Sequence, residues 1–248
     1  MVKILPIFLS AGMGTRLNHS HPKCLLELND VPLIVRSIFA LKYFNFDEIV
    51  IVVGYEKESI KNKLGSEISG IKIHYIDNEK FYETGTAYSF YLTKKIAQNK
   101  NLDVMMIHGD VFFDKKIFFQ EINFNESNVF LDSNFSMKTN DEMVVFGKKS
   151  HVISIEKGPN KEILKLHERE ILGESLGINI FKVNILENLF ENLKKSIEIN
   201  KKIHWEQTIK SLTSNFDIKL NFVDIAPINW VNINYKDDLE LVSKFDMD

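Results

Sequence analysis

The sequence predicts an α/β fold: a Rossmann-like, doubly wound and mostly parallel sheet, with a small antiparallel subregion in the second half of the chain. Three observations support this. The apolar run Ile4–Leu9 is typical of a strand buried on both faces of a parallel sheet, and Glu48–Val53 and Ile71–Ile76 are the next two expected strands. Segments with helical spacing separate these runs, so the order β-α-β-α-β is complete by residue 76. From residue 128 the expected strands become short and closely spaced, which indicates antiparallel pairing.

The individual elements follow from local patterns. Pro32 suits the first turn of a helix, and the next helix is expected over Lys57–Lys63. We then expect helices at 88–97, 115–121 and 183–197, a helix that begins at residue 204, and a last helix near Asp237, which would cap it. Further strands are expected at 104–107, 128–132, 142–148, 152–156, 163–167, 173–181 and 218–224.

Composition restricts the class of protein. The chain has 248 residues, of which 44% are hydrophobic and 26% charged, the balance of a soluble globular domain. The net charge of −3 offers no basic field to a nucleic acid. Cys24 is the single cysteine, which excludes an internal disulfide and suits a reducing compartment, and no partner that would activate its thiol is evident. We expect no signal peptide, no membrane span and a cytoplasmic protein.

The loop after the first strand has the properties of an anion site. Gly12 and Gly14 allow successive backbone N–H groups to point into one concavity. Arg16 and Lys23 add positive charge close behind. The carboxyl end of a first strand is where open α/β sheets bind phosphate-bearing ligands. The alternative is an ordinary turn, because the pattern is neither a Walker loop nor a dinucleotide fingerprint.

A second candidate follows the strand Val104–Ile107. Asp110 comes directly after His108 and Gly109, and a carboxylate at the end of a buried strand needs compensation. Hard oxygen donors suit Mg²⁺, so Asp110 is a candidate metal ligand. The alternative is a turn or capping aspartate, a role for which Asp114 is better placed. His108 is expected to pack at the strand end.

The string LSAGMGTRL at residues 9–17, with Pro22 and Lys23 behind it, resembles the leading motif of the nucleotidyltransferase (sugar-nucleotide pyrophosphorylase) superfamily, L-A-x-G-x-G-[ST]-R-[LM] followed by P-K. The resemblance implies a GT-A-like nucleotidyltransferase fold in which this loop wraps a nucleoside triphosphate. It implies catalytic roles for Arg16, Lys23 and Asp110, with Mg²⁺ as cofactor. The nucleotide-binding residues that it implies in this loop are Leu9, Ser10, Ala11, Gly12, Met13, Gly14 and Thr15, together with Arg16 and Lys23.

A small-residue turn at 84–89 is similar to the base- or sugar-contacting turn of this superfamily. It adds nucleotide-binding candidates at Thr84, Gly85, Thr86 and Ser89; alternatively, the segment is only a well-capped loop. The segment after it also looks like one found in phosphocholine-type cytidylyltransferases.

Two strings resemble the acceptor side of small cytidylyltransferases. Glu174, in G-E-x-x-G-I, would meet an amine on the acceptor, the alternative being a solvated turn residue. Trp205 and Glu206 are the other acceptor-binding candidates, because an aromatic face next to an acid suits a cationic group. The alternative for Trp205 is the core.

The segment from Trp230 to Leu239 resembles the closing motif of the superfamily. Asn232 and Asn234 stand where many relatives have Glu and Asp, so a site with two carboxylates is in doubt. Asn234 is nevertheless the second Mg²⁺ ligand that the resemblance implies, either directly or through water.

Together these features resemble the small cytidylyltransferase branch, whose acceptors are phosphocholine, aminoethylphosphonate or phosphoglutamine. The implied reaction joins CMP from CTP to a small phosphorylated or phosphonate acceptor, with release of pyrophosphate, for cell-surface or capsule modification. We expect a single domain, 1–248, made of a nucleotide-binding half (1–127), an acceptor-binding half (128–229) and a closing strand and helix (230–248). No nucleic acid or membrane partner is expected, and a homo-oligomer is compatible with the sequence. The alternatives are a sugar-1-phosphate nucleotidyltransferase using UTP, dTTP or GTP, and a regulatory subunit that binds nucleotide without chemistry.

Overall fold

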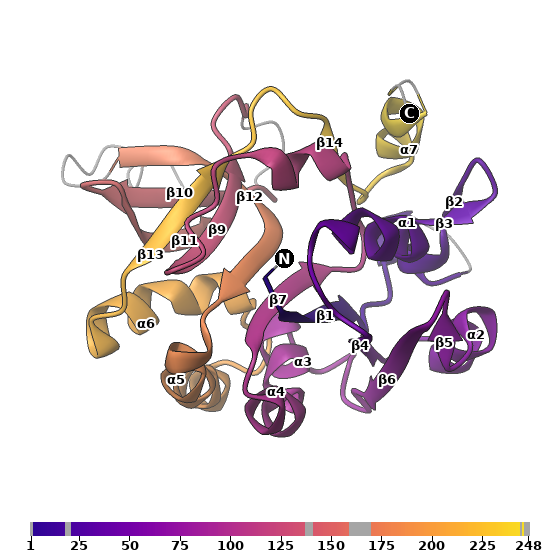
Figure 1. The fold of residues 1–248 in the computed structure, drawn as a ribbon, viewed down its shortest axis with the longest axis horizontal. Helices are drawn as coiled ribbons and strands as arrows, with labels where there is room; N and C mark the ends of the chain where they lie inside the picture. The colour runs from indigo at the N-terminus through magenta and orange to yellow at the C-terminus, as the bar shows by residue number, and fades with distance from the viewer. Residues whose placement is uncertain (1, 18–20, 137–140, 159–169, 244, 246–248) are drawn as a thin grey trace.

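The computed structural model describes residues 2–17, 21–136, 141–158, 170–243 and 245 (Figure 1). The strands are β1 Ile4–Ser10, β2 Glu27–Leu28, β3 Val31–Pro32, β4 Glu48–Val53, β5 Glu67–Ile68, β6 Ile71–Asp77, β7 Asp103–His108, β8 Val111–Phe113, β9 Ser127–Asp132, β10 Met143–Lys148, β11 His151–Lys157, β12 Glu170–Phe181, β13 Leu220–Asp224 and β14 Trp230–Asn232. The α-helices are α1 Leu33–Ala40, α2 Lys57–Leu64, α3 Thr86–Leu92, α4 Lys94–Lys100, α5 Leu186–Ile199, α6 Ile209–Phe216 and α7 Lys236–Val242. The 3₁₀ turns are η1 Thr15–Leu17, η2 Lys23–Leu25, η3 Leu41–Tyr43, η4 Lys115–Phe119, η6 Val183–Ile185 and η7 Trp205–Thr208.

A ten-stranded sheet runs through the molecule in the order β10-β11-β13-β9-β12-β7-β1-β4-β6-β5. Its centre, β7-β1-β4-β6, is parallel throughout, as the continuous apolar runs predicted. Because the chain adds β4 and β6 on one side of β1 and β7 on the other, the topology reverses between β1 and β7. Ligands bind at such a reversal in open α/β sheets.

The second half of the chain extends this sheet. β12 pairs antiparallel with both β7 and β9, and β10 and β11 form an antiparallel pair. β13 lies parallel to β9, so the subregion is mixed, not purely antiparallel. It is also continuous with the central sheet rather than a small separate patch. The strand expected at 163–167 lies outside the described residues.

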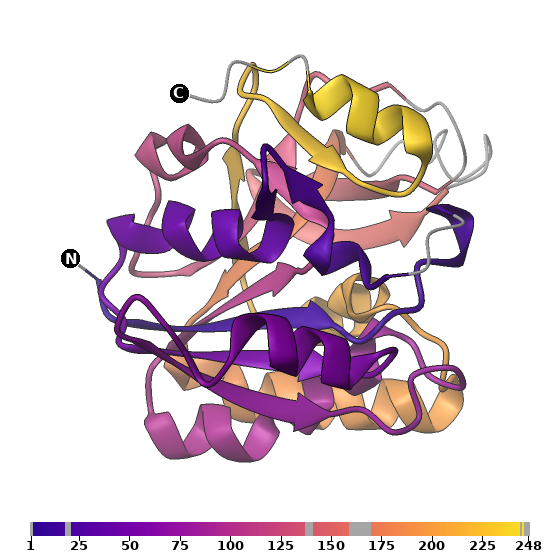
Figure 2. The ribbon, with the colours of Figure 1, turned by 90° about the vertical axis from the view of Figure 1, so that its right-hand side faces the viewer.

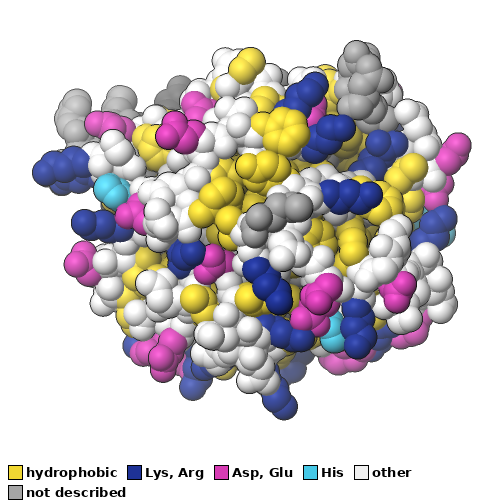
Figure 3. Space-filling model, viewed as in Figure 1, with side chains coloured by type: hydrophobic (Ala, Val, Ile, Leu, Met, Phe, Trp, Pro, Cys, Tyr) yellow, Lys and Arg dark blue, Asp and Glu magenta, His cyan; other side chains and the backbone are white. Residues whose placement is uncertain are grey.

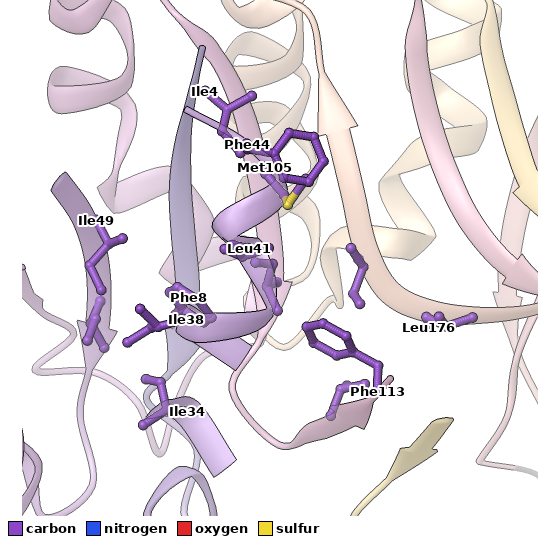
Figure 4. Close-up of a cluster of buried hydrophobic side chains, with 14 of the residues drawn as sticks. Ile4, Phe8, Ile34, Ile38, Leu41, Phe44, Ile49, Met105, Phe113 and Leu176 are labelled. Atoms are coloured by element: carbon purple, nitrogen blue, oxygen red, sulfur yellow. The ribbon is translucent and has the colours of Figure 1, made fainter. Parts of the chain in front are cut away.

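Helices cover both faces of the sheet (Figures 1 and 2). Residues of α3, α4, α5 and α6 share one buried cluster with strand residues such as Leu5 and Val50. On the opposite face Ile34 and Ile38 of α1 pack with Phe8 of β1 (Figure 4). Strands β1, β4 and β7 are therefore buried on both sides, which explains their continuous apolar runs, whereas β6 carries Lys72 and His74 at partly or fully exposed positions.

Local boundaries depart from the expectations in three places. The helix expected at 88–97 begins at Thr86 and is divided into α3 and α4 at Thr93. The segment after Asp114 is the 3₁₀ turn η4, and Asp114 caps it as expected by accepting from the backbone N–H of Lys116 at 2.8 Å. At α7, however, Asp238 accepts the N–H groups of residues 234 and 235, so the capping role predicted for Asp237 is wrong.

The surface carries charges of both signs over much of the face in Figure 3, with hydrophobic side chains gathered near its middle. None of the helices in the described part of the chain has the length and apolar character needed to cross a bilayer.

Candidate active site

The ends of β1 and β7 bring the two sequence motifs together. Leu9 pairs with His108, and the N–H of Gly109 donates to the carbonyl oxygen of Leu9 at 3.0 Å. A cavity of about 230 Å³ opens here. Most of the residues that line it are predicted site residues, and three are not, namely Cys24, Gly109 and His204. The lining consists of Leu9, Ser10, Gly12, Gly14, Thr15, Arg16, Lys23, Cys24, Gly109, Asp110, His204 and Asn234. Of the other two loop residues, Ala11 is 5% exposed and Met13 is 40% exposed.

Lys23 lies between the two predicted metal ligands. Its Nζ donates to Asp110 Oδ2 at 3.2 Å and to Asn234 Oδ1 at 2.9 Å. Gly14 has a φ of +62°, and a β-carbon there would lie 2.7 Å from the Lys23 Cγ. The absence of a side chain at position 14 therefore lets Lys23 lie against the loop.

Arg16 connects the loop to the second half of the chain. Its guanidinium forms an ion pair with Asp141, donates to Asn234 Oδ1 at 3.3 Å and lies 5.7 Å from the centre of the Tyr235 ring. Asp141 also accepts from the Tyr235 hydroxyl at 2.9 Å and pairs with Lys157 at 3.1 Å. Burial opposes ionisation of Asp141, but these hydrogen bonds and charges outweigh it and lower its pKa. Sequence reasoning missed Asp141, which lies in no recognisable motif.

The donor set fits a Mg²⁺ ion that takes its remaining ligands from water and substrate phosphates. The oxygens of Asp110 and Asn234 both approach the Lys23 ammonium, so they already surround a cation. The buried Oδ1 of Asn232 has no hydrogen-bond partner among the described residues. No group of three or more His, Cys, Asp or Glu side chains suitable for a metal occurs within the described ranges. One carboxylate with substrate phosphates is a normal Mg²⁺ arrangement, whereas an all-protein cage is not required.

The turn at Thr84–Thr86 is held in place by the protein. The N–H of Gly85 donates to Lys201 O at 2.8 Å, and a β-carbon at Gly85 would collide with the carbonyl oxygen of Ile203. Thr86 Oγ1 accepts the N–H of residue 205 at 3.1 Å. Thr84, Gly85 and Thr86 are half-buried and do not belong to the cavity lining, so their contact with a nucleotide stays a prediction.

Ser89 has a structural role instead of the predicted contact with nucleotide. It is only 5% exposed, and its hydroxyl accepts from Asn78 Nδ2 at 3.0 Å. The same amide donates to Thr84 Oγ1 at 3.2 Å. Ser89 therefore helps to hold the turn in place through Asn78, whose amide it shares with Thr84.

Trp205 belongs to the core, so its predicted contact with an acceptor is wrong. The side chain is fully buried and packs edge-on against Phe181, with ring centres 5.8 Å apart. Its Nε1 donates to His108 Nε2 at 2.8 Å, which satisfies the indole N–H. The reason is local: in the short turn η7 the indole faces the sheet. His108 packs at the strand end, as expected.

Glu206 is also buried, and its predicted contact with an acceptor is wrong for the same reason. It is 1% exposed, and Oε1 lies 3.1 Å from His108 Nε2. Burial raises the pKa of Glu206. Because an indole N–H can only donate, His108 Nε2 accepts from Trp205 and carries no proton.

A second cavity, of about 300 Å³, contains Glu174, the remaining acceptor candidate. Five carboxylate residues and three aromatic residues line it together with polar and small apolar groups, and Asn234 lines both cavities. No lysine, arginine or histidine of the described residues contributes to its lining. These acidic and aromatic residues are Asp132, Asp141, Glu142, Glu174, Asp238, Phe135, Trp230 and Tyr235.

Two cavity residues have strongly shifted pKa values. Burial raises the pKa of the Cys24 thiol to about 12, so Cys24 is not a thiolate nucleophile. Burial lowers the pKa of His204 to about 4; the positive charges of Lys157 and Arg16 add to the shift, and Asp141 opposes it. His204 is therefore neutral at physiological pH. Sequence reasoning missed His204 because the acceptor-binding role was predicted for the next two residues, Trp205 and Glu206.

Comparison with known proteins agrees with this geometry. Residues 6–121 match the family model of the MobA-like NTP transferase domain. A CTP:phosphoglutamine cytidylyltransferase of Campylobacter jejuni is 24% identical over an alignment of 266 positions, gaps included, which covers 95% of this chain and 97% of that protein. A choline-phosphate cytidylyltransferase of Streptococcus pneumoniae is 34% identical over 118 residues, which cover 45% of this chain and 47% of that protein.

A solved structure of the CTP:phosphocholine cytidylyltransferase from Streptococcus pneumoniae matches with a TM-score of 0.70 and 22% identity over 98% of each chain. At that identity the match shows the fold alone, and it confirms the predicted Rossmann-like nucleotidyltransferase fold. The matched stretches span 18% to 52% of the length of three curated relatives.

The half-buried, neutral His204 predicts a loss of stability in acid. Between pH 6.5, its ordinary pKa, and about 4, the unfolded chain binds a proton that the folded chain does not, so the free energy of unfolding falls as the pH falls. We expect His204→Asn to remove about 2 kcal/mol of the loss that the wild type shows between pH 7.5 and pH 5. Urea unfolding of both proteins at the two pH values measures this. Equal losses in the two proteins would show that His204 titrates normally.

Proposed function

We propose that the chain is a nucleotidyltransferase that joins CMP from CTP to a small acceptor with release of pyrophosphate, which the match of residues 6–121 to an NTP transferase domain supports. The acceptor would carry a phosphate or phosphonate group at one end and an ammonium group at the other. Phosphocholine, aminoethylphosphonate and phosphoglutamine are the candidates that the sequence suggested.

The observation that carries the proposal is the pair of adjoining cavities that share Asn234. The first combines the glycine loop with Arg16 and Lys23, and so suits a polyphosphate. The second combines carboxylates with aromatic rings, and so suits a cation. An acceptor that spans the junction would point its anionic end toward the cations of the first cavity and its ammonium into the second.

The contents of the second cavity also bear on the alternative acceptor, a sugar 1-phosphate. Carboxylates can bind sugar hydroxyls, but a cavity lined by five of them, with aromatic rings beside them, suits an ammonium better than a neutral sugar. Two relatives are named for phosphoglutamine and choline-phosphate, which agrees with this preference.

In the proposed reaction, an acceptor oxygen attacks the α-phosphorus of CTP as the bond from that phosphorus to the β-phosphate oxygen breaks. The attacking oxygen is already anionic, so no general base is needed, and catalysis consists of alignment and charge neutralisation. The loop N–H groups and Arg16 would hold the β- and γ-phosphates, and Lys23 would neutralise charge at the α-phosphate. A Mg²⁺ ion held by Asp110 and Asn234 would supply further charge neutralisation on phosphate oxygens.

Binding of substrate would exchange ion pairs within the protein for contacts to phosphate. Arg16 is paired with Asp141, and Lys23 with Asp110. A triphosphate competes with these carboxylates for the same cations. Asp141 already lines the second cavity, so loss of its ion pair with Arg16 would leave its charge less compensated there.

Pyrophosphate release across a panel of substrates tests the function directly. CTP, UTP, dTTP and GTP would each be combined with phosphocholine, aminoethylphosphonate, phosphoglutamine and glucose 1-phosphate in the presence of Mg²⁺. We expect release with CTP and an ammonium-bearing acceptor. Release with another nucleotide and glucose 1-phosphate would favour the sugar-1-phosphate alternative. CTP binding without turnover on any acceptor would favour a regulatory subunit.

Lys23→Ala should lower kcat by about 10²- to 10³-fold, because it removes the cation nearest the proposed α-phosphate site. Circular dichroism should show an intact fold, since this loop lysine is not part of the core. Lys95→Ala, at an exposed position of α4, controls for loss of one positive charge. Turnover within a few-fold of the wild type would remove Lys23 from the mechanism.

Glu174→Gln should raise the acceptor KM by about ten-fold and leave the KM for CTP within two-fold, because it deletes a negative charge from the second cavity only. The matched control is Glu170→Gln, an exposed glutamate of the same strand. Steady-state kinetics with each substrate varied in turn give both constants. Equal effects on CTP and acceptor would contradict an acceptor-binding role.

A further inference from the structure

An apolar hollow separate from both cavities of the candidate active site is lined by residues of α1, η3, β8 and η4. Its volume is about 610 Å³, and no residue of its lining also lines the two cavities that share Asn234. Hollows of this size that are mainly apolar, with a few polar groups, are typical of small-molecule sites. We call this hollow the aromatic groove, because it is lined by the six aromatic residues Phe39, Tyr43, Phe112, Phe113, Phe119 and Phe245.

Two of these rings are open to solvent. Phe119 is 60% exposed and Tyr43 is 44% exposed, and their ring centres lie 5.9 Å apart. Single exposed apolar side chains are ordinary, but exposed rings that cluster around a hollow mark a place where another molecule covers apolar surface. The aromatic groove therefore suits an occupant with an apolar body.

Three cations of the lining have no carboxylate partner. Arg36, Lys42 and Lys115 form no ion pair with any Asp or Glu in the part of the chain that the structure describes. In the active site, by contrast, Lys23 and Arg16 each pair with a carboxylate. The cations of the aromatic groove therefore complement a negative charge that an occupant would bring.

The other contacts of these cations leave their charges uncompensated. The Nε of Arg36 donates to the carbonyl oxygen of Leu28 at 3.2 Å, and the Nζ of Lys42 lies 4.8 Å from the centre of the Phe39 ring. The carboxylate in the lining is that of Asp114, which caps η4 instead. An anionic group in the groove would thus meet cations without first displacing a described carboxylate.

The apolar surface continues beyond Tyr43. A further hollow, of about 700 Å³, shares Lys42 and Tyr43 with the aromatic groove, and its other lining residues are all apolar. The Tyr43 ring meets the Phe44 ring at 84° and the Phe119 ring at 59°, so these rings offer no parallel pair of faces to a planar group. An elongated apolar path of this kind suits a flexible chain better than a compact ring.

We propose that the aromatic groove binds a single-chain acyl anion, with the chain along the aromatic rings and the carboxylate or phosphate head group at Arg36, Lys42 and Lys115. Burial of the chain covers the exposed rings, and the head group compensates the three cations. Arg36 is the most directional of the three donors, because its planar guanidinium is already oriented by Leu28. The site lies outside the nucleotide and acceptor cavities, so it does not depend on the proposed function.

Isothermal titration of the whole chain with laurate, kept below its micelle concentration, tests the site. We expect saturable binding of one laurate per chain. Acetate carries the same head group without the long chain, and dodecyl maltoside carries a chain of the same length without the charge, so each should bind at least about ten-fold more weakly. Equal affinity for laurate and dodecyl maltoside would overturn the role of the cations.

Two variants separate the parts of the contact. Phe119→Ser should weaken laurate binding about ten-fold because it removes apolar surface, and Lys42→Gln about three-fold because it removes a charge at the solvent edge. Both side chains are exposed, so the urea midpoint should not change. The matched controls are Ile199→Ser, at an 88% exposed position of α5, and Lys95→Gln on α4, which should leave the affinity within about two-fold of the wild type.

Other results would overturn the proposal. The absence of saturable binding in the wild type, or wild-type affinity in Phe119→Ser, would show that the groove does not hold the chain. Tighter binding of the planar anion 1-naphthoate than of laurate would assign the groove to an aryl ligand. A dimer in analytical ultracentrifugation that Phe119→Ser dissociates would assign it to a second copy of the chain. None of these measurements uses turnover, so their outcome is separate from that of the proposed function.

Discussion

The parallel pairing of β1 with β7 is the constraint on which the site depends. It places Leu9 beside His108 and holds Gly109 on the backbone of β1, so the glycine loop and Asp110 leave the sheet at the same edge. A β-carbon at Gly109 would collide with the hydroxyl oxygen of Ser10. The approach of the two loops therefore needs both the strand register and a residue without a side chain. The cations and carboxylates can meet across the cavity only because this edge is fixed by the buried core on both faces.

The charges in the site balance each other in the absence of substrate. Lys23 is 11% exposed in its side chain and pairs with Asp110, while Arg16 pairs with Asp141. An unpaired ammonium at the depth of Lys23 would be unfavourable, so Lys23 needs a partner in the substrate-free protein, whereas the Arg16 side chain is 43% exposed and depends less on its pairing. A triphosphate can replace the carboxylates at no comparable cost, because it brings its own negative charge to the same cations. The carboxylates released in this way are the groups that a metal ion or an ammonium would then neutralise.

Sequence reasoning succeeded where the signal was local and failed where the determining contact was distant. Apolar runs predicted β1, β4 and β7, and the motif residues Lys23, Asp110 and Asn234 converge in one cavity. Asp141 was missed because its partners Arg16 and Tyr235 are about a hundred residues away and no periodicity marks it. Trp205 and Glu206 were predicted to face the acceptor but are buried in the core. A turn of four residues has no pattern that distinguishes its buried face from its exposed one.

The long strand β12 explains how two cavities built from distant parts of the chain keep a fixed relation. Its C-terminal part pairs with β7, beside the nucleotide site, while Glu174 near its other end pairs with Asp132 of β9 at the acceptor cavity. The register shifts between Ser175 and Asn179, where Gly177 has a φ of +72° and a β-carbon would lie 2.9 Å from the His108 ring. A residue with a side chain could not make this bend against His108 without strain. Because the strand is continuous through the bend, the acidic cavity is positioned by the same hydrogen-bonded sheet that positions the phosphate-binding loop.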